Sequence, residues 1–124
     1  MNVLLWVFQA YLAASFVVFG GMKILRDREE LAKTAFGWVE DFSDTSVKLI
    51  GLLDVLAGLG LILPGATDIA PVLTPLAALG GIMLAGGGSV VHLRRSETAK
   101  AAVNLHFIAL LAVVAWGRFG PYQF

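Results

Sequence analysis

The chain has 124 residues, which is enough for one domain. Its residues are 58% hydrophobic and only 15% charged, whereas a soluble domain usually carries about 25% charged residues. The formal net charge is zero and the sequence has no basic patch, so we expect no nucleic-acid partner. The chain has no cysteine, which excludes disulfide chemistry, cysteine nucleophiles and cysteine metal sites within it.

Four long segments of the chain carry almost no charge, and each is close to the length of about 20 residues that a bilayer-spanning helix needs. The sequence therefore predicts an all-α integral membrane protein, folded as an antiparallel four-helix bundle. We expect a single transmembrane domain over residues 1–124. Its helices are predicted at about residues 3–25, 46–63, 72–93 and 99–119, and the second should stop at the Pro-Gly pair that follows it.

Two alternatives fit the charge-poor segments less well. A soluble bundle would show charges at regular spacing on the outer face of each helix, and these segments are apolar all round. A signal peptide would begin with a positively charged region, and the N-terminal stretch MNVLLWVFQAYLAASF has none.

The polar connection between the first two predicted helices has a helical pattern of its own. Leu31, Ala35, Trp38 and Phe42 recur at a spacing that places them on one face of a helix. We expect a short amphipathic helix at the membrane interface here. Its polar face is more acidic than basic, which weakens the case for an anchor to anionic lipid.

The cationic residues indicate how the chain is oriented. Eight of the nine Lys and Arg residues flank the first and third connections, and the ninth, Arg118, lies near the C-terminus. By the positive-inside rule, the side of the membrane that carries these eight cations is cytoplasmic. Both termini are therefore predicted outside the cytoplasm. The eight residues are Lys23, Arg26, Arg28, Lys33, Lys48, Arg94, Arg95 and Lys100.

Polar and small residues share one face in each predicted helix. Small residues let membrane helices approach closely, and buried polar side chains join them, so we expect these faces to point into the bundle. The faces are Gln9, Ala13, Phe16, Gly20 and Lys23 in the first helix; Gly51, Asp54 and Gly58 in the second; Gly81, Ala85, Gly88 and His92 in the third; and Val103, His106 and Leu110 in the fourth.

Asp54 is the residue that most needs an explanation, because a charged side chain at mid-bilayer costs about 2.5–3.5 kcal/mol on insertion scales. It lies eight residues past Ser46, or about 12 Å from the cytoplasmic end of its helix. Lys23, His92 and His106 lie in the same half of the bundle. The four side chains are therefore predicted as a ligand-binding site or a buried polar cluster. In the second case, a contact of Asp54 with Lys23 or His106 would fix the helix register.

The two histidines give little support for a metal or haem. Such a site needs several ligands at close, fixed spacing, and His92 and His106 lie on different helices with no partner at i+4. We therefore predict no metal. His92, beside two arginines, is most simply a residue of the membrane interface.

The order and spacing of four segments resemble the DoxX-like family of small four-helix bacterial membrane proteins. The segments are FVVFGGMKIL, LIGLLDVLAGLGLILPG, TPLAALGGIMLAGGGSVVHLRR and NLHFIALLAVVAWGRFG, and the likeness covers essentially the whole chain. In the family pattern a Glu commonly stands at the position of Asp54. The resemblance implies a multi-pass protein of the bacterial cytoplasmic (inner) membrane. It also implies an association with membrane redox complexes, some of which use quinone.

Three functions are compatible with these observations. The first is a non-enzymatic subunit that binds a hydrophobic molecule, such as a quinone or a lipid, or that anchors a redox-protein partner. The second is a membrane-embedded isomerase or oxidoreductase, with Asp54 and His106 as an acid–base pair. The third is a proton-coupled transporter, which would need a homodimer because four helices are few for alternating access. The sequence favours the first and leaves open whether any reaction is catalysed.

Overall fold

The structure, a computed structural model, describes residues 2–26 and 42–123, except for the side chain of Asp44. Over these residues the chain forms helices α1 (Asn2–Leu25), α3 (Asp44–Thr67), α4 (Leu73–Arg94) and α5 (Thr98–Phe119). Each of these four helices is long and apolar enough to cross a membrane. The prediction of four long apolar helices is therefore confirmed, whereas the amphipathic helix predicted in the first connection falls outside the described residues.

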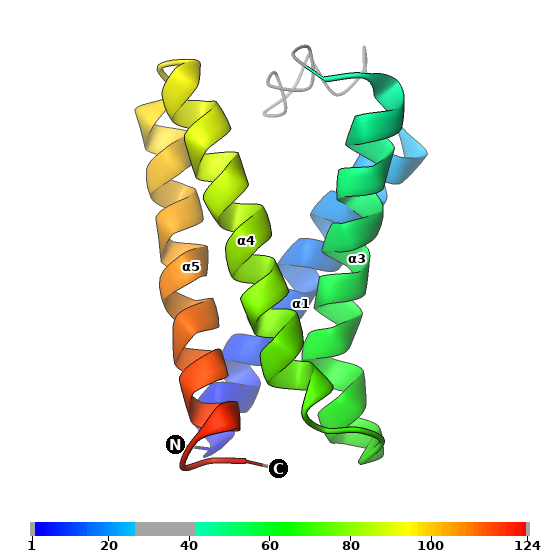
Figure 1. Cartoon of the computed structure of the whole chain (residues 1–124), viewed down its shortest axis with the longest axis vertical. Coiled ribbons are helices and arrows are strands. Elements are labelled where there is room, and N and C mark those ends of the chain that lie inside the picture. The colour runs from blue at the N-terminus through cyan, green and yellow to red at the C-terminus, as the bar shows by residue number, and fades with distance from the viewer. Residues whose placement is uncertain (1, 27–41, 124) are drawn as a thin grey trace.

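The helices alternate in direction, so that the bundle is antiparallel and both ends of the chain lie at the same end of the molecule (Figure 1). We call this the terminal end. Helix α1 packs mainly against α3, and α4 packs mainly against α5. The ribbons of the two pairs converge at the terminal end and diverge toward the end that carries the α4–α5 turn, which we call the loop end (Figure 1).

A continuous apolar core joins the four helices. Its centre is made of leucine, alanine, phenylalanine and valine side chains that are almost fully buried. These are Leu5, Leu12, Ala13, Phe16, Ala57, Leu61, Ala78, Leu111, Val114 and Ala115. A smaller contact near the loop end joins α3 to α4, where Val91 packs against Val47.

The outer surface of the bundle is apolar as well. Large side chains stand out from every helix, and Met83 on α4 is 78% exposed. A soluble monomer rarely exposes apolar area on this scale, because it would drive aggregation in water. The surface is that of a protein surrounded by lipid.

Helix α3 is longer than the sequence predicts. Ser43 caps its first turn by accepting a hydrogen bond from the Ser46 amide at 3.1 Å. The helix then continues past Pro64 to Thr67 and ends at Asp68, which adopts a left-handed conformation with a φ of 56°. The predicted stop at the Pro-Gly pair was therefore wrong. Proline is tolerated inside membrane helices because neighbouring helices and side chains satisfy the backbone groups around it. In the turn before Pro64, Gln9 of α1 donates to the Leu61 carbonyl oxygen at 2.6 Å, which joins α1 to α3.

Candidate functional site

Lys23 and Asp54 form a buried ion pair between α1 and α3. The distance from Lys23 Nζ to Asp54 Oδ2 is 2.6 Å, and the two residues are 9% and 4% exposed. Of the two contacts considered for Asp54, the structure shows the one with Lys23. Lys23 thus gives the Asp54 carboxylate a partner, which the apolar residues next to it in the sequence cannot provide.

The pair lies where the backbones of α1 and α3 approach most closely. A Cβ placed on Gly20 would lie 2.6 Å from the Gly51 carbonyl oxygen and 2.8 Å from Asp54 Cβ. A Cβ placed on Gly51 would lie 2.8 Å from Lys23 Cβ. No real side chain tolerates such distances, so the two glycines are what allows Lys23 and Asp54 to meet.

His92 belongs to a different group, at the turn between α4 and α5. Its Nδ1 atom lies 3.1 Å from Glu97 Oε1, and Lys100 Nζ donates to Glu97 Oε2 at 2.9 Å. Arg95 Nε lies 3.3 Å from the same carboxylate. The hydrogen bond from Lys100, followed by that from His92, lowers the pKa of Glu97 from its ordinary 4.5 to about 2. Glu97 thus holds together a turn that is otherwise cationic.

His106 lies elsewhere again, on the exposed side of α5. Its Nε2 atom is 2.7 Å from the hydroxyl oxygen of Tyr11 on α1, and its Nδ1 atom contacts the Val103 carbonyl oxygen. Tyr11 is 45% exposed. The two side chains bridge the outer edge of the α1–α5 seam, by which we mean the line along which these two helices meet.

The inward faces predicted for α1, α3 and α4 are confirmed, and the one predicted for α5 is wrong. Val103 and His106 are exposed and Leu110 is only half-buried. The buried small residues of α5, such as Ala101 and Ala115, lie on another face of the helix. His106 was predicted to face inward with Val103 and Leu110, but Ala102 and Ala109, the small residues one turn away on either side of it, are exposed as well.

The four residues predicted as one site therefore occupy three places. Lys23 and Asp54 are joined to each other, His92 is joined to Glu97 at the loop end, and His106 is joined to Tyr11 at the seam. In residues 2–26 and 42–123, no group of three or more His, Asp or Glu side chains is arranged to hold a metal ion.

Aromatic rings surround the Tyr11–His106 pair. The Phe107 ring stacks on Tyr11 with a centroid distance of 5.9 Å and lies 4.2 Å from His106. Phe107 also approaches Phe16 in the core at 6.3 Å. The hydrogen-bonded pair thus stands at the edge of a small aromatic surface that is continuous with the core.

A second buried polar network, at the terminal end, was not predicted. Arg118 is 3% exposed, and its guanidinium donates to Gln9 Oε1 at 2.8 Å, to Asn2 Oδ1 at 2.6 Å and to the Tyr122 carbonyl oxygen at 2.9 Å. The guanidinium also lies 5.5 Å from the Trp6 ring centroid. The sequence signal for this network was an arginine directly after a glycine in the last turn of an apolar helix.

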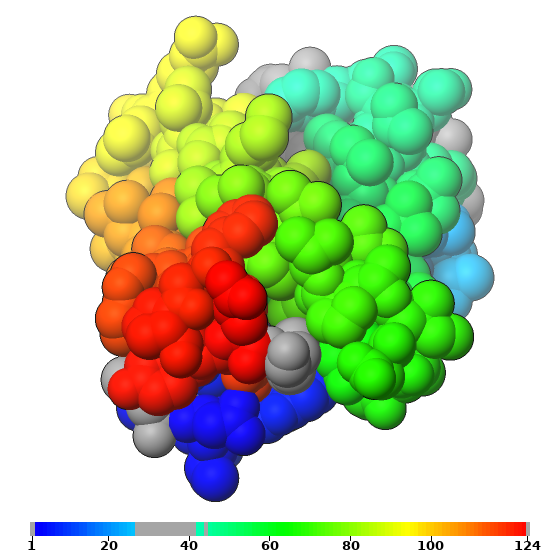
Figure 2. Space-filling view, turned by 60° about the horizontal axis from the view of Figure 1, so that its bottom comes forward, coloured from blue at the N-terminus to red at the C-terminus, as the bar shows by residue number. Residues whose placement is uncertain are grey.

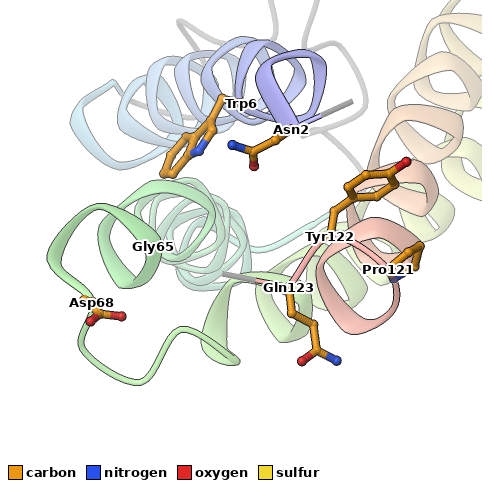
Figure 3. A pocket seen from close by; sticks show the side chains of 7 residues that line it. All are labelled: Asn2, Trp6, Gly65, Asp68, Pro121, Tyr122 and Gln123. Carbon is orange, nitrogen blue, oxygen red and sulfur yellow. The ribbon is translucent and has the colours of Figure 1, made fainter.

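An open pocket of about 490 Å³ adjoins this network. Figure 2 shows the terminal end, where the N-terminal residues, the α3–α4 connection and the C-terminal tail lie side by side. The pocket is lined from these three parts of the chain, and in Figure 3 the side chains of Asn2 and Trp6 come to it from α1. It is open to the outside, and neither His106 nor Asp54 lines it.

The fold and the apolar outer surface define a multi-pass integral membrane protein with four candidate spans in the described chain. A match to the family model for DoxX-like proteins covers residues 7–114, so the chain belongs to the DoxX-like family. Comparison with curated proteins and with solved structures gives no match.

Proposed function

We propose that the protein is a non-enzymatic membrane protein that binds a hydrophobic molecule, a quinone or a lipid-like compound, within the bilayer. The observation that carries the proposal is the exposed Tyr11–His106 hydrogen bond on the lipid-facing edge of the α1–α5 seam. Polar side chains in a membrane usually face the bundle interior, because lipid offers them no hydrogen bonds. A polar pair that faces lipid is therefore a place where a lipid-soluble molecule with a polar head finds a partner.

The depth of the pair supports this assignment. Tyr11 lies nine residues past Asn2, or about 14 Å along α1, and His106 lies eight residues past Thr98, or about 12 Å along α5. Both side chains are therefore far from either membrane surface. A ligand that reaches them has to be soluble in the hydrocarbon region.

The enzymatic alternative loses support from the positions of its two residues. An acid–base pair must reach the same reacting atoms, within about 3 Å of each. Asp54 instead bonds Lys23 between α1 and α3, whereas His106 bonds Tyr11 at the seam between α1 and α5. We therefore assign Asp54 to the packing of α1 on α3 and His106 to the ligand site.

We further propose that the protein lies in the bacterial cytoplasmic membrane with both termini outside the cytoplasm. The loop end carries most of the cations, among them Arg94, Arg95 and Lys100, whereas the terminal end carries Arg118 in its buried network. The positive-inside rule then places the loop end in the cytoplasm.

The test is to purify the protein in mild detergent and identify the bound molecules by mass spectrometry. We expect a defined hydrophobic molecule with the native chain and its loss from the double variant Tyr11→Phe/His106→Leu. The control is Met83→Leu, because Met83 is also exposed to lipid but lies on α4. If all three samples carry the same bulk lipid, the proposal fails and the search moves to protein partners.

A further inference from the structure

The hydrogen bonds of His106 determine which of its ring nitrogens carries the proton. Nδ1 contacts the Val103 carbonyl oxygen, which can only accept a hydrogen bond, so Nδ1 must carry the hydrogen. In a neutral imidazole the other nitrogen, Nε2, is then an acceptor. The Tyr11 hydroxyl is its partner at 2.7 Å, so the tyrosine O–H must donate to Nε2.

This arrangement fixes the polarity of the exposed hydroxyl. The single hydrogen of the Tyr11 hydroxyl is used in the bond to His106, and the oxygen keeps an acceptor lone pair. The hydroxyl offers a molecule in the membrane a hydrogen-bond acceptor and no donor. A molecule whose head only accepts, such as a ketone or an oxidised quinone, finds no partner at this oxygen.

We infer that the Tyr11–His106 site binds lipid-soluble molecules whose head group donates an O–H, such as phenols, hydroquinones and long-chain alcohols, and discriminates against their carbonyl counterparts. The inference rests on the proposed function and names the class of ligand. The Phe107 ring, stacked on Tyr11, supplies an apolar surface beside the hydroxyl for the aromatic or aliphatic body of the ligand.

The test compares two probes of similar size, para-nonylphenol and para-nonylacetophenone, in lipid nanodiscs of phosphatidylethanolamine and phosphatidylglycerol. The phenol donates an O–H, whereas the acetophenone only accepts. We expect the native protein to bind the phenol about tenfold more tightly, which corresponds to the net contribution of about one hydrogen bond. Equal binding, or a preference for the acetophenone, overturns the inference.

The variant His106→Leu should remove the preference for the phenol over the acetophenone. Without the Nε2 acceptor the Tyr11 O–H is free to donate, so we expect acetophenone binding to rise about tenfold and the preference to close. Both residues lie on the lipid-facing side, so the change leaves the core intact, and size exclusion and circular dichroism check the fold. An unchanged preference in this variant contradicts the role assigned to His106.

The double variant Tyr11→Phe/His106→Leu distinguishes a failure of the proposed function from a failure of the inference alone. If the native protein binds neither probe better than this variant does, both the proposed function and the inference fail. If it binds the acetophenone better, a ligand site remains and only its polarity is wrong. Nitrogen-15 NMR of the His106 ring, assigned with His106→Leu, reads the tautomer directly, and a proton on Nε2 also overturns the inference.

Discussion

At the scale of single residues, the buried pair of Lys23 and Asp54 has the largest consequence for stability. Each side chain is almost fully shielded by α1 and α3, and each satisfies the other. Removing one partner leaves the second buried without its counter-charge, which costs more than the pair itself contributes. A stabilising role of the pair is therefore measured by a double-mutant cycle rather than by one substitution.

We expect Lys23→Met and Asp54→Asn each to lower the free energy of unfolding by about 2 kcal/mol or more. The loss of unfolding free energy in the double variant should be smaller than the sum of the two single losses by at least about 1 kcal/mol, because neither group is then left unpaired. Unfolding by SDS in mixed micelles, followed by circular dichroism, measures both quantities. Strict additivity would mean that the two side chains act independently.

Glu97 provides a pH dependence with a defined sign. Its pKa falls from 4.5 to about 2 on folding, chiefly through the hydrogen bond from Lys100. A carboxyl group whose pKa is lowered by folding stabilises the folded state above its unfolded value. This contribution is lost as the pH falls through the folded value.

We therefore expect the melting temperature of the native protein to fall more between about pH 5 and about pH 2 than that of Glu97→Gln, which cannot titrate at this position. The effect should be small, because this carboxylate is partly exposed and water screens its contacts. Melting curves by intrinsic fluorescence at several pH values in detergent measure the difference. Parallel losses in the two proteins would show that other carboxylates cause the acid sensitivity.

At the scale of elements, glycine positions decide how closely the helices pack. Gly20 and Gly21 are adjacent on α1 and have opposite surroundings. A Cβ on Gly20 would collide with the backbone of α3 at Gly51, whereas a Cβ on Gly21 meets nothing within 4 Å in the described structure. The two positions make a matched pair in which the same chemical change has different results.

Gly20→Ala should lower the free energy of unfolding by about 1–3 kcal/mol, because the two helices must move apart to admit the methyl group. Gly21→Ala should be neutral or raise stability by up to about 1 kcal/mol, because alanine is the better helix former. SDS unfolding of both variants beside the native protein provides the comparison. Equal losses at the two positions would contradict the close approach of α1 and α3.

The elements also show how far the sequence alone could be interpreted. Charge-free runs of bilayer length predicted the four long helices, because a membrane segment must satisfy its own backbone and exclude charge. The Pro-Gly pair predicts an end of α3 at Pro64, but the helix continues to Thr67 because a membrane helix can continue through proline. The inward faces of α1, α3 and α4 were predicted because their small residues recur with the polar ones. The same reasoning fails in α5, where the buried small residues, such as Ala101 and Ala115, lie on another face than His106.

The site was less predictable than the fold. Depth along a helix placed Lys23 and His106 equally within reach of Asp54, but depth does not say which neighbouring helix a side chain faces. The contacts of Arg118 with Gln9 and Asn2 depend on which ends of the helices converge, and that is a property of the tertiary structure. Nothing in the sequence relates Tyr11 to His106, because the two residues lie 95 positions apart in the chain.

At the scale of the whole molecule, the two ends of the bundle differ in charge and chemistry. The terminal end contains the buried Arg118 network, and the loop end contains the cationic turn around Glu97. We propose that the loop end faces the cytoplasm, and the lack of cysteine in the chain makes this directly testable. A single cysteine introduced at either end is then the only thiol that a membrane-impermeant maleimide can label.

We expect Ala66→Cys, in the exposed last turn of α3 at the terminal end, to react with such a maleimide in whole bacterial spheroplasts. Ser96→Cys, exposed in the α4–α5 turn at the loop end, should react only after the membrane is permeabilised. The reason is that cations flanking a short loop hold it in the cytoplasm during insertion, and Arg94, Arg95 and Lys100 flank this turn. The opposite pattern would invert the orientation. Labelling of both sites in whole spheroplasts would indicate two populations of opposite orientation. In that case the Arg and Lys residues of the first and third connections would not determine how the chain inserts.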